Sequence, residues 1–494
     1  MNKIITQSLL SIIIIYFGVV IGFINSIYLF PKFLAPEQIG LIRQIINLSS
    51  LLIPLTTFGV GAGYLKYYPL SKDNTSKNEL FSFFLITILI CYFLVAIFFQ
   101  LFENNIKNLF TSKSEILFQY YSVIFLILLI MSLSSLIETF LRARYDITLS
   151  NFSNGVSNRL LTGLSIILFS FSLLSFQSLI WLQIPIYLFG LLILIKYAFY
   201  KEKFFIKINL EVFKKFFNKI SNFSFFSILI SFGNIIIQNI DILLISALLG
   251  LSETGIYTTA FYIGIVIEMP RRVISQISMP IISNLFNENK LNTIKKYYKS
   301  VSVNQLIIGL ILYIVIMINL ENIFNIIPNK ENFIAGKGVV VFIGLAKLIN
   351  MCSSFGNELI MMSKYYRFNL ITIIILAIIT ISLNIILIPI YGIIGAAYSA
   401  LISAIFFNLI KIFFIKLKIG FTPFSKNTII IILVGLIVYY ISLYLPSINN
   451  ILLDIIIKSF FTIIIFIIPI YLLRLSKEFN QIINNFIPFN HSKW

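Results

Sequence analysis

Long apolar runs separated by short polar connections cover almost the whole chain. A helix needs about 20 mainly apolar residues to cross a bilayer, and the chain holds about fourteen such runs. We expect membrane spans at 8–30, 39–65, 80–102, 116–141, 148–172, 178–199, 223–249, 255–285, 300–319, 338–362, 368–388, 393–415, 427–445 and 451–473. The pattern therefore predicts an all-α integral membrane protein.

One face of the seventh expected span is polar. Its polar side chains recur at steps of three and four, which places them on one stripe of a helix: Ser224, Ser227, Ser231, Asn234, Gln238 and Asp241. The eighth expected span carries Glu268, Arg271 and Arg272 beside Pro270, within an otherwise apolar run. Ionised side chains inside membrane-length helices are costly and usually face a water-filled cavity. We expect such a cavity beside these two helices.

Other expected spans also carry polar or charged residues. The second holds Arg43 and Asn47, the fifth holds Arg159, and the tenth holds Lys347 and Glu358. Lys347 and Glu358 share a face of this expected span but lie about 16 Å apart along its axis, too far to pair directly. Small polar residues can alternatively mediate helix packing in lipid, and a long Arg43 side chain can reach the outer interface.

Two further alternatives concern the carboxylates. Glu268 can pair with Arg271 or Arg272 at helical spacing, which would give the arginines a structural role. Asp241 ends the polar stripe of its span, where we expect it near the outer face and in the same cleft as Gln238 and Asn234. It is then either a partly desolvated carboxylate that binds and releases a proton or a solvated aspartate at the interface.

Composition and charge support the membrane assignment and add an orientation. Hydrophobic residues make up 59% of the chain, charged residues 11%, and the mean hydropathy is +0.99. Most lysines and arginines lie in connections on one side, including seven lysines between 196 and 219; the other side holds Lys32, Lys107, Lys113, Lys330 and Lys337. By the positive-inside rule the first side and both termini are cytoplasmic. The net charge of +19 thus reflects topology and anionic lipid, and needs no nucleic acid.

The chain also divides into related halves. We expect an N-terminal lobe of six spans at 1–199, a cytoplasmic amphipathic linker at 200–222, a C-terminal lobe at 223–415, and two further spans with a tail at 416–494. Gly18 and Gly40 recur 215 positions later as Gly233 and Gly255. Each half opens with a span and a short acidic outward turn, and the second glycine starts the next span. This arrangement is typical of transporters built from two repeats with a site between them.

Three stretches connect the chain with a known family: FPKFLAPEQIG at 30–40 followed by Arg43, GLSETGIY at 250–257, and PIYGIIGAA at 389–397. With the span count, they make the chain resemble the Wzx-type polysaccharide flippases of the multidrug/oligosaccharidyl-lipid/polysaccharide exporter superfamily. The resemblance implies two six-helix lobes around a V-shaped cleft, with two added C-terminal helices. It also implies movement of a lipid-linked oligosaccharide from the inner to the outer leaflet, alongside polymerase and glycosyltransferase machinery.

The arginines agree with an anionic cargo. Arginine is rarer than lysine here, yet Arg43, Arg159, Arg271 and Arg272 all lie within expected spans. A guanidinium stays protonated when buried and grips phosphate through two hydrogen bonds, so a diphosphate headgroup is the expected cargo. The candidate cavity residues are Arg43, Asn47, Arg159, Ser231, Asn234, Gln238, Arg271, Arg272 and Lys347. The candidate coupling carboxylates, for H⁺ or Na⁺, are Asp241, Glu268 and Glu358.

Other functions fit less well. His491, in the C-terminal tail, is the only histidine, and the chain has no P-loop, cysteine cluster or G-x-S-x-G motif. We therefore expect no enzymatic activity, no cofactor and no metal site. An ion-coupled multidrug exporter of the same fold is the alternative, although it would be expected to have an anionic cavity. A polysaccharide polymerase or ligase normally needs a larger outward loop than the one at about 320–337.

Overall fold

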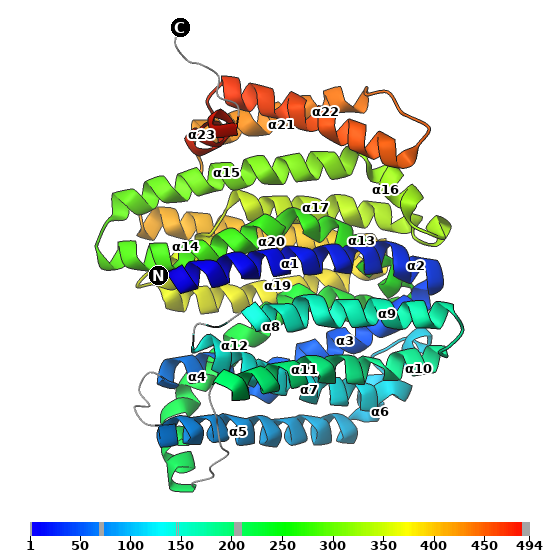
Figure 1. Cartoon of the computed structure of the whole chain (residues 1–494), viewed down its shortest axis with the longest axis vertical. Helices are drawn as coiled ribbons and strands as arrows, with labels where there is room; N and C mark the ends of the chain where they lie inside the picture. The colour runs from blue at the N-terminus through cyan, green and yellow to red at the C-terminus, as the bar shows by residue number, and fades with distance from the viewer. Residues whose placement is uncertain (1, 69–73, 145, 147, 202–209, 487–494) are drawn as a thin grey trace. The chain divides into compact units, whose positions relative to one another are not determined.

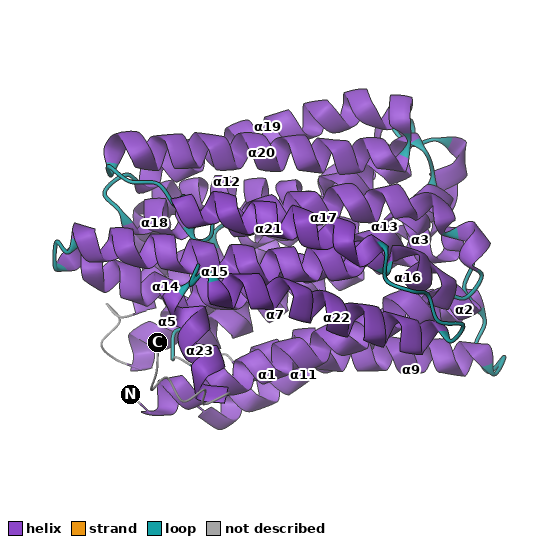
Figure 2. Cartoon of the chain, turned by 90° about the horizontal axis from the view of Figure 1, so that it is seen from above, coloured by secondary structure: helices purple, strands orange, loops and turns teal. Residues whose placement is uncertain are grey.

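The computed structural model describes residues 2–68, 74–144, 146, 148–201 and 210–486. Every regular element within these residues is a helix (Figure 2). Figure 1 labels the helices in chain order. Their bounds are α1 Asn2–Ile24, α2 Phe30–Phe33, α3 Pro36–Thr57, α4 Val60–Tyr67, α5 Asn74–Leu101, α6 Glu103–Lys107, α7 Tyr121–Arg142, α8 Thr148–Phe152, α9 Asn158–Ser170, α10 Phe176–Trp181, α11 Gln183–Lys201 and α12 Leu210–Leu248. They continue as α13 Leu251–Ile265, α14 Met269–Asn287, α15 Leu291–Ile318, α16 Leu320–Ile326, α17 Lys337–Cys352, α18 Gly356–Met362, α19 Tyr366–Tyr391, α20 Ile393–Lys418, α21 Lys426–Leu443, α22 Ile451–Leu472 and α23 Lys477–Phe486.

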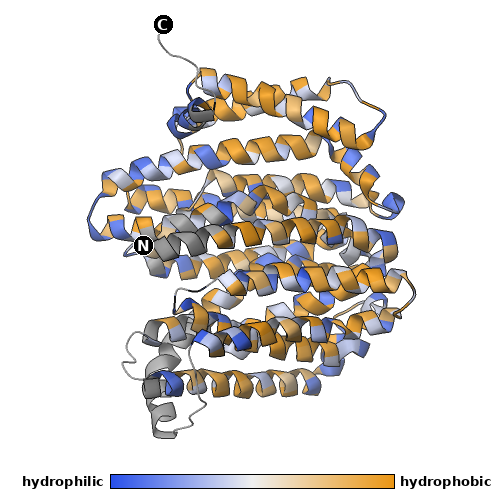
Figure 3. Cartoon of the chain, viewed as in Figure 1, coloured by the Kyte–Doolittle hydropathy of each residue, from blue (hydrophilic) through white to orange (hydrophobic). Residues whose placement is uncertain are grey.

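Within the described residues, twelve helices are long and apolar enough to cross a membrane. In Figure 3, α21 and α22 are apolar over almost their whole length. The expectation of an all-α, multi-pass membrane protein is therefore confirmed. Of the fourteen expected spans, the two that are not among these twelve are 148–172 and 255–285. Both are interrupted in the structure, the first by a π-helical turn at Ser153–Ser157 and the second by a 3₁₀ turn at Val266–Glu268.

The chain packs as two compact units. The first comprises Met1–Thr259 with Ala377–Ile393, and the second comprises Ala260–Leu376 with Ile394–Trp494. The first unit thus includes α12, because α12 packs along α3. The lobes expected at 1–199 and 223–415 stay a prediction. Of the expected linker, residues 202–209 lie outside the described part, and residues 210–222 form the beginning of α12.

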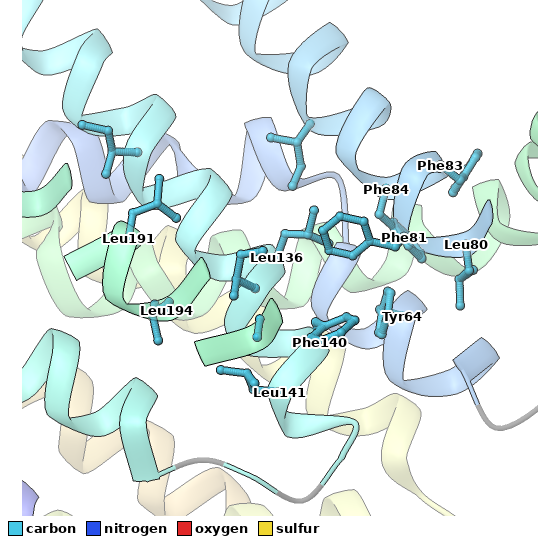
Figure 4. Close-up of a cluster of buried hydrophobic side chains, with 14 residues drawn as sticks. Tyr64, Leu80, Phe81, Phe83, Phe84, Leu136, Phe140, Leu141, Leu191 and Leu194 are labelled. Atoms are coloured by element: carbon cyan, nitrogen blue, oxygen red, sulfur yellow. The ribbon is translucent and has the colours of Figure 1, made fainter. Parts of the chain in front are cut away.

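An aromatic core holds the first unit together. α4, α5, α7 and α11 meet around Tyr64, Phe84 and Phe140 (Figure 4). The ring of Tyr64 lies 5.8 Å from that of Phe84, and Phe81 meets Phe140 edge to face at 5.6 Å. Edge-to-face and tilted ring pairs add about 0.5–1.5 kcal/mol each beyond the burial of their area. These contacts therefore pack α4, α5, α7 and α11 against one another.

A reciprocal glycine contact joins α3 to α13 within the first unit. A Cβ atom built on Gly40 would lie 1.8 Å from the carbonyl oxygen of Leu251, and one built on Gly255 would lie 1.9 Å from that of Pro36. Pro36 and Leu251, like Gly40 and Gly255, are 215 positions apart. The contact is therefore reciprocal, as at a two-fold interface: Gly40 approaches the Leu251 carbonyl, and Gly255 approaches the equivalent Pro36 carbonyl. One expected detail is wrong: both helices begin before the acidic residue, so each glycine lies inside its helix.

In the second unit, α15 is the central helix. It packs against α17, α21 and α22 around an apolar core that includes Ile307, Met351, Val438 and Phe466. The helices α21 and α22 are tied to their neighbours by polar groups as well. On α22, Asp454 forms an ion pair of 2.8 Å with Lys458 and accepts a hydrogen bond from Asn322 at 2.5 Å. Further charged and polar side chains of the unit lie on α14, α17, α18 and α20.

Candidate functional site

The break between α13 and α14 places a carboxylate inside the second unit. Pro270 lies in the first turn of α14 and has no N–H to donate to the preceding turn. The chain therefore forms the 3₁₀ turn Val266–Glu268 between the two helices. Gly264 and Gly344 let this turn lie close to α17, because a Cβ atom on Gly264 would meet the Ile343 side chain at 2.8 Å. As a result, the Glu268 side chain is directed at α17.

Three donors surround the Glu268 carboxylate. Arg271 donates from Nη1 to Oε1 at 2.7 Å, Lys347 lies 3.3 Å from Oε2, and Asn350 donates to Oε1 at 3.4 Å. Glu268 is 7% exposed. The expected pairing of Glu268 with Arg271 is confirmed, and Lys347 adds a second cation from α17. Removing one partner of a buried ion pair commonly costs about 3–5 kcal/mol, so this cluster is strongly interdependent.

The helix expected at 338–362 is not continuous, which corrects the sequence interpretation. α17 ends at Cys352, Ser354 adopts a left-handed conformation with φ of 53°, and α18 begins at Gly356. Lys347 and Glu358 are therefore on different helices, and the distance expected along one axis does not apply. Neighbouring side chains satisfy carbonyl groups freed by the break, as membrane-depth backbone requires. Arg271 Nε donates to the Ser354 carbonyl at 3.0 Å, and the Tyr298 hydroxyl donates to that of Ser353 at 3.1 Å.

Two residues that the sequence interpretation missed extend this network. Asn408 on α20 donates to Asn350 Oδ1 at 2.8 Å and accepts a hydrogen bond from the Ser353 hydroxyl. Lys411, one turn further on, is 2% exposed and lies over the Phe407 ring at 3.8 Å. Lys411 falls inside the expected span 393–415, but the sequence interpretation did not single it out as a buried charge. An asparagine and a lysine three positions apart in an apolar run are the signal that could have revealed this polar face.

Two further charged residues of the second unit lie beside the network. Arg272 is exposed, and within the described part of the chain no carboxylate lies at ion-pair distance from it. Glu358, in the first turn of α18, is half-buried. Its Oε2 atom is buried and has no hydrogen-bond donor among the described residues. The second unit therefore gathers Arg271, Arg272, Lys347 and Lys411 against two carboxylates.

In the first unit, the predicted arginines contact the first helix and its π-helical extension, Asn25–Leu29. Arg159 donates to the Gly18 carbonyl at 2.5 Å, and its own carbonyl accepts from Asn25 at 2.7 Å. Arg43 donates to the Ser26 hydroxyl at 2.7 Å and lies over the Phe30 ring at 4.6 Å. Both arginines thus hold parts of the first span in place, whatever else they contact.

The polar stripe of α12 is divided by its surroundings. Asn234 and Gln238 are exposed and Ser231 is half-buried, whereas Asp241 is 7% exposed. The Tyr257 hydroxyl on α13 donates to the Asp241 carboxylate. Asp241 therefore is not a solvated interfacial aspartate and does not share the open surroundings of Gln238 and Asn234. Asn47 is also buried, and donates to the Asn239 carbonyl of α12 at 3.2 Å. Ser224 and Ser227 have side chains outside the described part.

The arrangement is suited to binding an anion through hydrogen bonds and charge. Among the described residues, no group of three or more His, Cys, Asp or Glu side chains could hold a metal ion. The donors of the second unit are of the types that bind phosphate and carboxylate groups. The Arg271 guanidinium, the Lys347 ammonium and the Asn350 amide all contact the two carboxylate oxygens of Glu268.

Comparisons with known proteins identify a family and a fold. Residues 5–286 match a family model described as "Polysaccharide biosynthesis protein". No curated protein matches the chain in sequence. A solved structure of the lipid II flippase MurJ in an inward closed conformation is similar, with a TM-score of 0.72 and 16% identity over 93% of this chain and 98% of that one.

Two further solved structures share the fold. An inward-facing multidrug resistance MATE family transporter of the MOP superfamily has a TM-score of 0.65 and 12% identity, over 84% of this chain and 98% of that one. A MOP superfamily transporter from Pyrococcus furiosus, whose binding pocket is described as having reverse polarity, has a TM-score of 0.56 and 14% identity, over 84% and 95% of the two chains. The fold is therefore that of MOP superfamily transporters.

Proposed function

Because the chain belongs to the polysaccharide biosynthesis protein family, we propose that it is a flippase for a lipid-linked oligosaccharide. It moves a glycan carried on a polyprenyl diphosphate from the inner to the outer leaflet by alternating access. Surface polysaccharide assembly then uses the glycan outside, where a polymerase would receive it. We place the protein in the bacterial cytoplasmic membrane with both termini in the cytoplasm, in contact with membrane lipids.

The observation that carries this proposal is the cationic network of the second unit. Arg271 on α14, Lys347 on α17 and Lys411 on α20 are buried or half-buried, and Arg272 is exposed beside them. Placing a charged side chain at the middle of a membrane costs about 2.5–3.5 kcal/mol, so such a cluster implies a use for its charge. A diphosphate supplies two phosphates that a guanidinium and an ammonium can bind together. Arg43, Asn47, Arg159, Ser231, Asn234 and Gln238 are the candidate contacts in the first unit.

A small-molecule exporter of the same fold is the second candidate, because a MATE family transporter shares the fold. Cationic drugs would require free carboxylates in the cavity. Here Glu268 is neutralised by Arg271 and Lys347, and Asp241 is buried beneath Tyr257. This distribution favours an anionic cargo. Asp241, Glu268 and Glu358 remain the candidate groups for coupling to H⁺ or Na⁺.

Reconstitution separates the two candidates. The full chain is placed in proteoliposomes with a fluorescent short-chain polyprenyl diphosphate sugar in both leaflets, and a membrane-impermeant reductant is added outside. A flippase exposes the inner-leaflet probe, so nearly all fluorescence is lost, whereas protein-free vesicles lose about half. Transport of a fluorescent organic cation is measured in the same vesicles. Movement of the cation without movement of the lipid would contradict the flippase and favour the exporter.

A further inference from the structure

Glu268 occupies the position that an anionic ligand would take in the second unit. Its two carboxylate oxygens are held by a guanidinium on α14, an ammonium on α17 and the Asn350 amide, at 2.7, 3.3 and 3.4 Å. These donor types also bind phosphate oxygens, with comparable geometry. A phosphate that binds Arg271 and Lys347 through the same hydrogens must therefore displace the Glu268 carboxylate. The carboxylate and the cargo compete for one set of donors.

Once displaced, the carboxylate still lies against the apolar core, next to the partly exposed Arg271 and Lys347. The backbone of Glu268 is held in the short 3₁₀ turn, and Gly264 and Gly344 bring this turn against α17 without room for a Cβ atom. Ile267 and Met351 in the same core are fully buried. The Glu268 side chain therefore stays desolvated and close to the phosphate that replaced it. Both desolvation and a neighbouring negative charge favour the protonated form of a carboxyl group.

The charged and titratable groups around Glu268 come from several elements. Arg271 and Arg272 are on α14, Lys347 is on α17, Lys411 is on α20 and Glu358 is on α18. On α15, the Tyr298 hydroxyl is engaged with the Ser353 carbonyl. With cargo bound, Arg271 and Lys347 are engaged by the two phosphates, and an ionised Glu268 would add a third negative charge beside them. Protonation of Glu268 removes that charge. The balance at the site therefore favours taking up one proton when cargo binds.

We propose that Glu268 is a resident anion that couples cargo binding to protonation. In the empty transporter its carboxylate neutralises Arg271 and Lys347. When the diphosphate binds these two residues, Glu268 leaves them and takes one proton from solvent, forming a neutral carboxylic acid. When cargo is released on the other side, Glu268 gives up this proton and returns to Arg271 and Lys347. One proton thus moves with each cargo molecule, and the inference rests on the proposed function.

Calorimetry tests this on the purified full chain. The probe is a farnesyl diphosphate esterified to N-acetylglucosamine, because a diphosphate esterified at both ends has no proton to exchange near neutral pH. Titrations in two buffers with different ionisation enthalpies report the protons taken up per probe bound. We expect close to one proton near pH 7, and a dissociation constant that rises about tenfold for each pH unit. The sign follows from uptake: the bound state holds the extra proton, so raising the pH weakens binding.

A variant pair makes the assignment specific. Glu268→Gln removes the competing anion, and is expected to bind the probe more tightly, with no proton uptake and no pH dependence. Glu288→Gln is the matched control, because Glu288 is exposed and paired with Lys290 outside the network; it should bind like the parent. Binding by the parent without proton uptake, or weaker binding by Glu268→Gln, overturns the inference. Absence of any probe binding by a folded parent contradicts the proposed function instead. If Glu268→Gln does not fold, the number of protons taken up by the parent on probe binding decides the inference by itself.

Discussion

At the residue scale, the adjacent residues Arg271 and Arg272 of α14 have different surroundings. Arg271 uses two separate parts of its guanidinium, with Nη1 on Glu268 and Nε on the Ser354 carbonyl. It therefore links the break before α14 to the break after α17. Arg272 is exposed and makes neither contact. A sequence motif of two adjacent arginines thus contains one residue that links two helix breaks and one whose side chain is exposed.

Substitution by lysine should separate these roles. Arg271→Lys keeps the charge but cannot hold both partners, and a lost hydrogen bond to a charged group costs about 1.5–3 kcal/mol, so we expect a lower melting temperature. Arg272→Lys should leave the melting temperature unchanged and slow lipid flipping about tenfold, because a single ammonium cannot form the bidentate phosphate contact. Arg142→Lys, exposed at the end of α7, is the control. Unchanged flipping by Arg272→Lys would exclude a guanidinium–phosphate contact there.

At the scale of elements, close helix approach and helix breaks position the polar groups. Gly40 and Gly255 let α3 and α13 touch through their backbones, each against a carbonyl of the other helix. The chain is interrupted at Val266–Glu268 and at Ser353–Phe355, and side chains donate to the Ser353 and Ser354 carbonyls at the second break. Local unwinding at membrane depth is tolerated only with such partners. Glu268, Arg271 and Glu358 therefore all lie next to an interruption, whereas Lys411 lies on the continuous helix α20.

The glycine contact gives a prediction at this scale. Gly40→Ala or Gly255→Ala places a Cβ atom less than 2 Å from a backbone oxygen, which must push the two helices apart. Overpacking of this kind costs about 1–3 kcal/mol, so both variants should melt at lower temperature than the parent. Gly155→Ala is the control, because a Cβ atom there meets nothing within 4 Å. Equal melting temperatures for Gly40→Ala and Gly155→Ala would show that this contact does not constrain the packing.

For the whole molecule, the comparisons confirm membership of the MOP superfamily fold that the sequence motifs indicated. The orientation in the membrane is a separate matter and still depends on the lysine and arginine distribution. Twelve apolar helices in the described residues satisfy the length requirement for spans in either direction. Only the charge asymmetry between the two sets of connections indicates which ends face the cytoplasm.

Single cysteines test this orientation. Lys330 lies in an exposed turn after α16, and Glu288 lies in the exposed turn after α14. The variants Lys330→Cys and Glu288→Cys are made in a background in which Cys91 and Cys352 are replaced by alanine. We expect a membrane-impermeant thiol reagent outside intact cells to label position 330 but neither position 288 nor a cysteine in the 200–222 linker. All three should react after the cells are opened. Labelling of the linker in intact cells would reverse the assigned orientation.

The sequence by itself determined where twelve membrane-length helices lie and identified charges on several of them. Hydropathy is a sum over neighbouring residues, so about 20 apolar residues identify a span without knowledge of its contacts. Pro270 similarly marks a local break through its missing N–H. The pairing of Glu268 with Arg271 was also accessible, because three positions on a helix bring two side chains together.

Only the tertiary structure decided which distant groups meet. The sequence does not specify that Lys347 on α17 completes the Glu268 site, that Asn408 joins it from α20, or that Tyr257 covers Asp241. It also gave no indication of the turn at Ser354, which separates Lys347 from Glu358. Such contacts depend on which helix faces which, and many apolar helices are interchangeable in hydropathy. The ion pairs and hydrogen bonds that distinguish them exist only once the helices have packed.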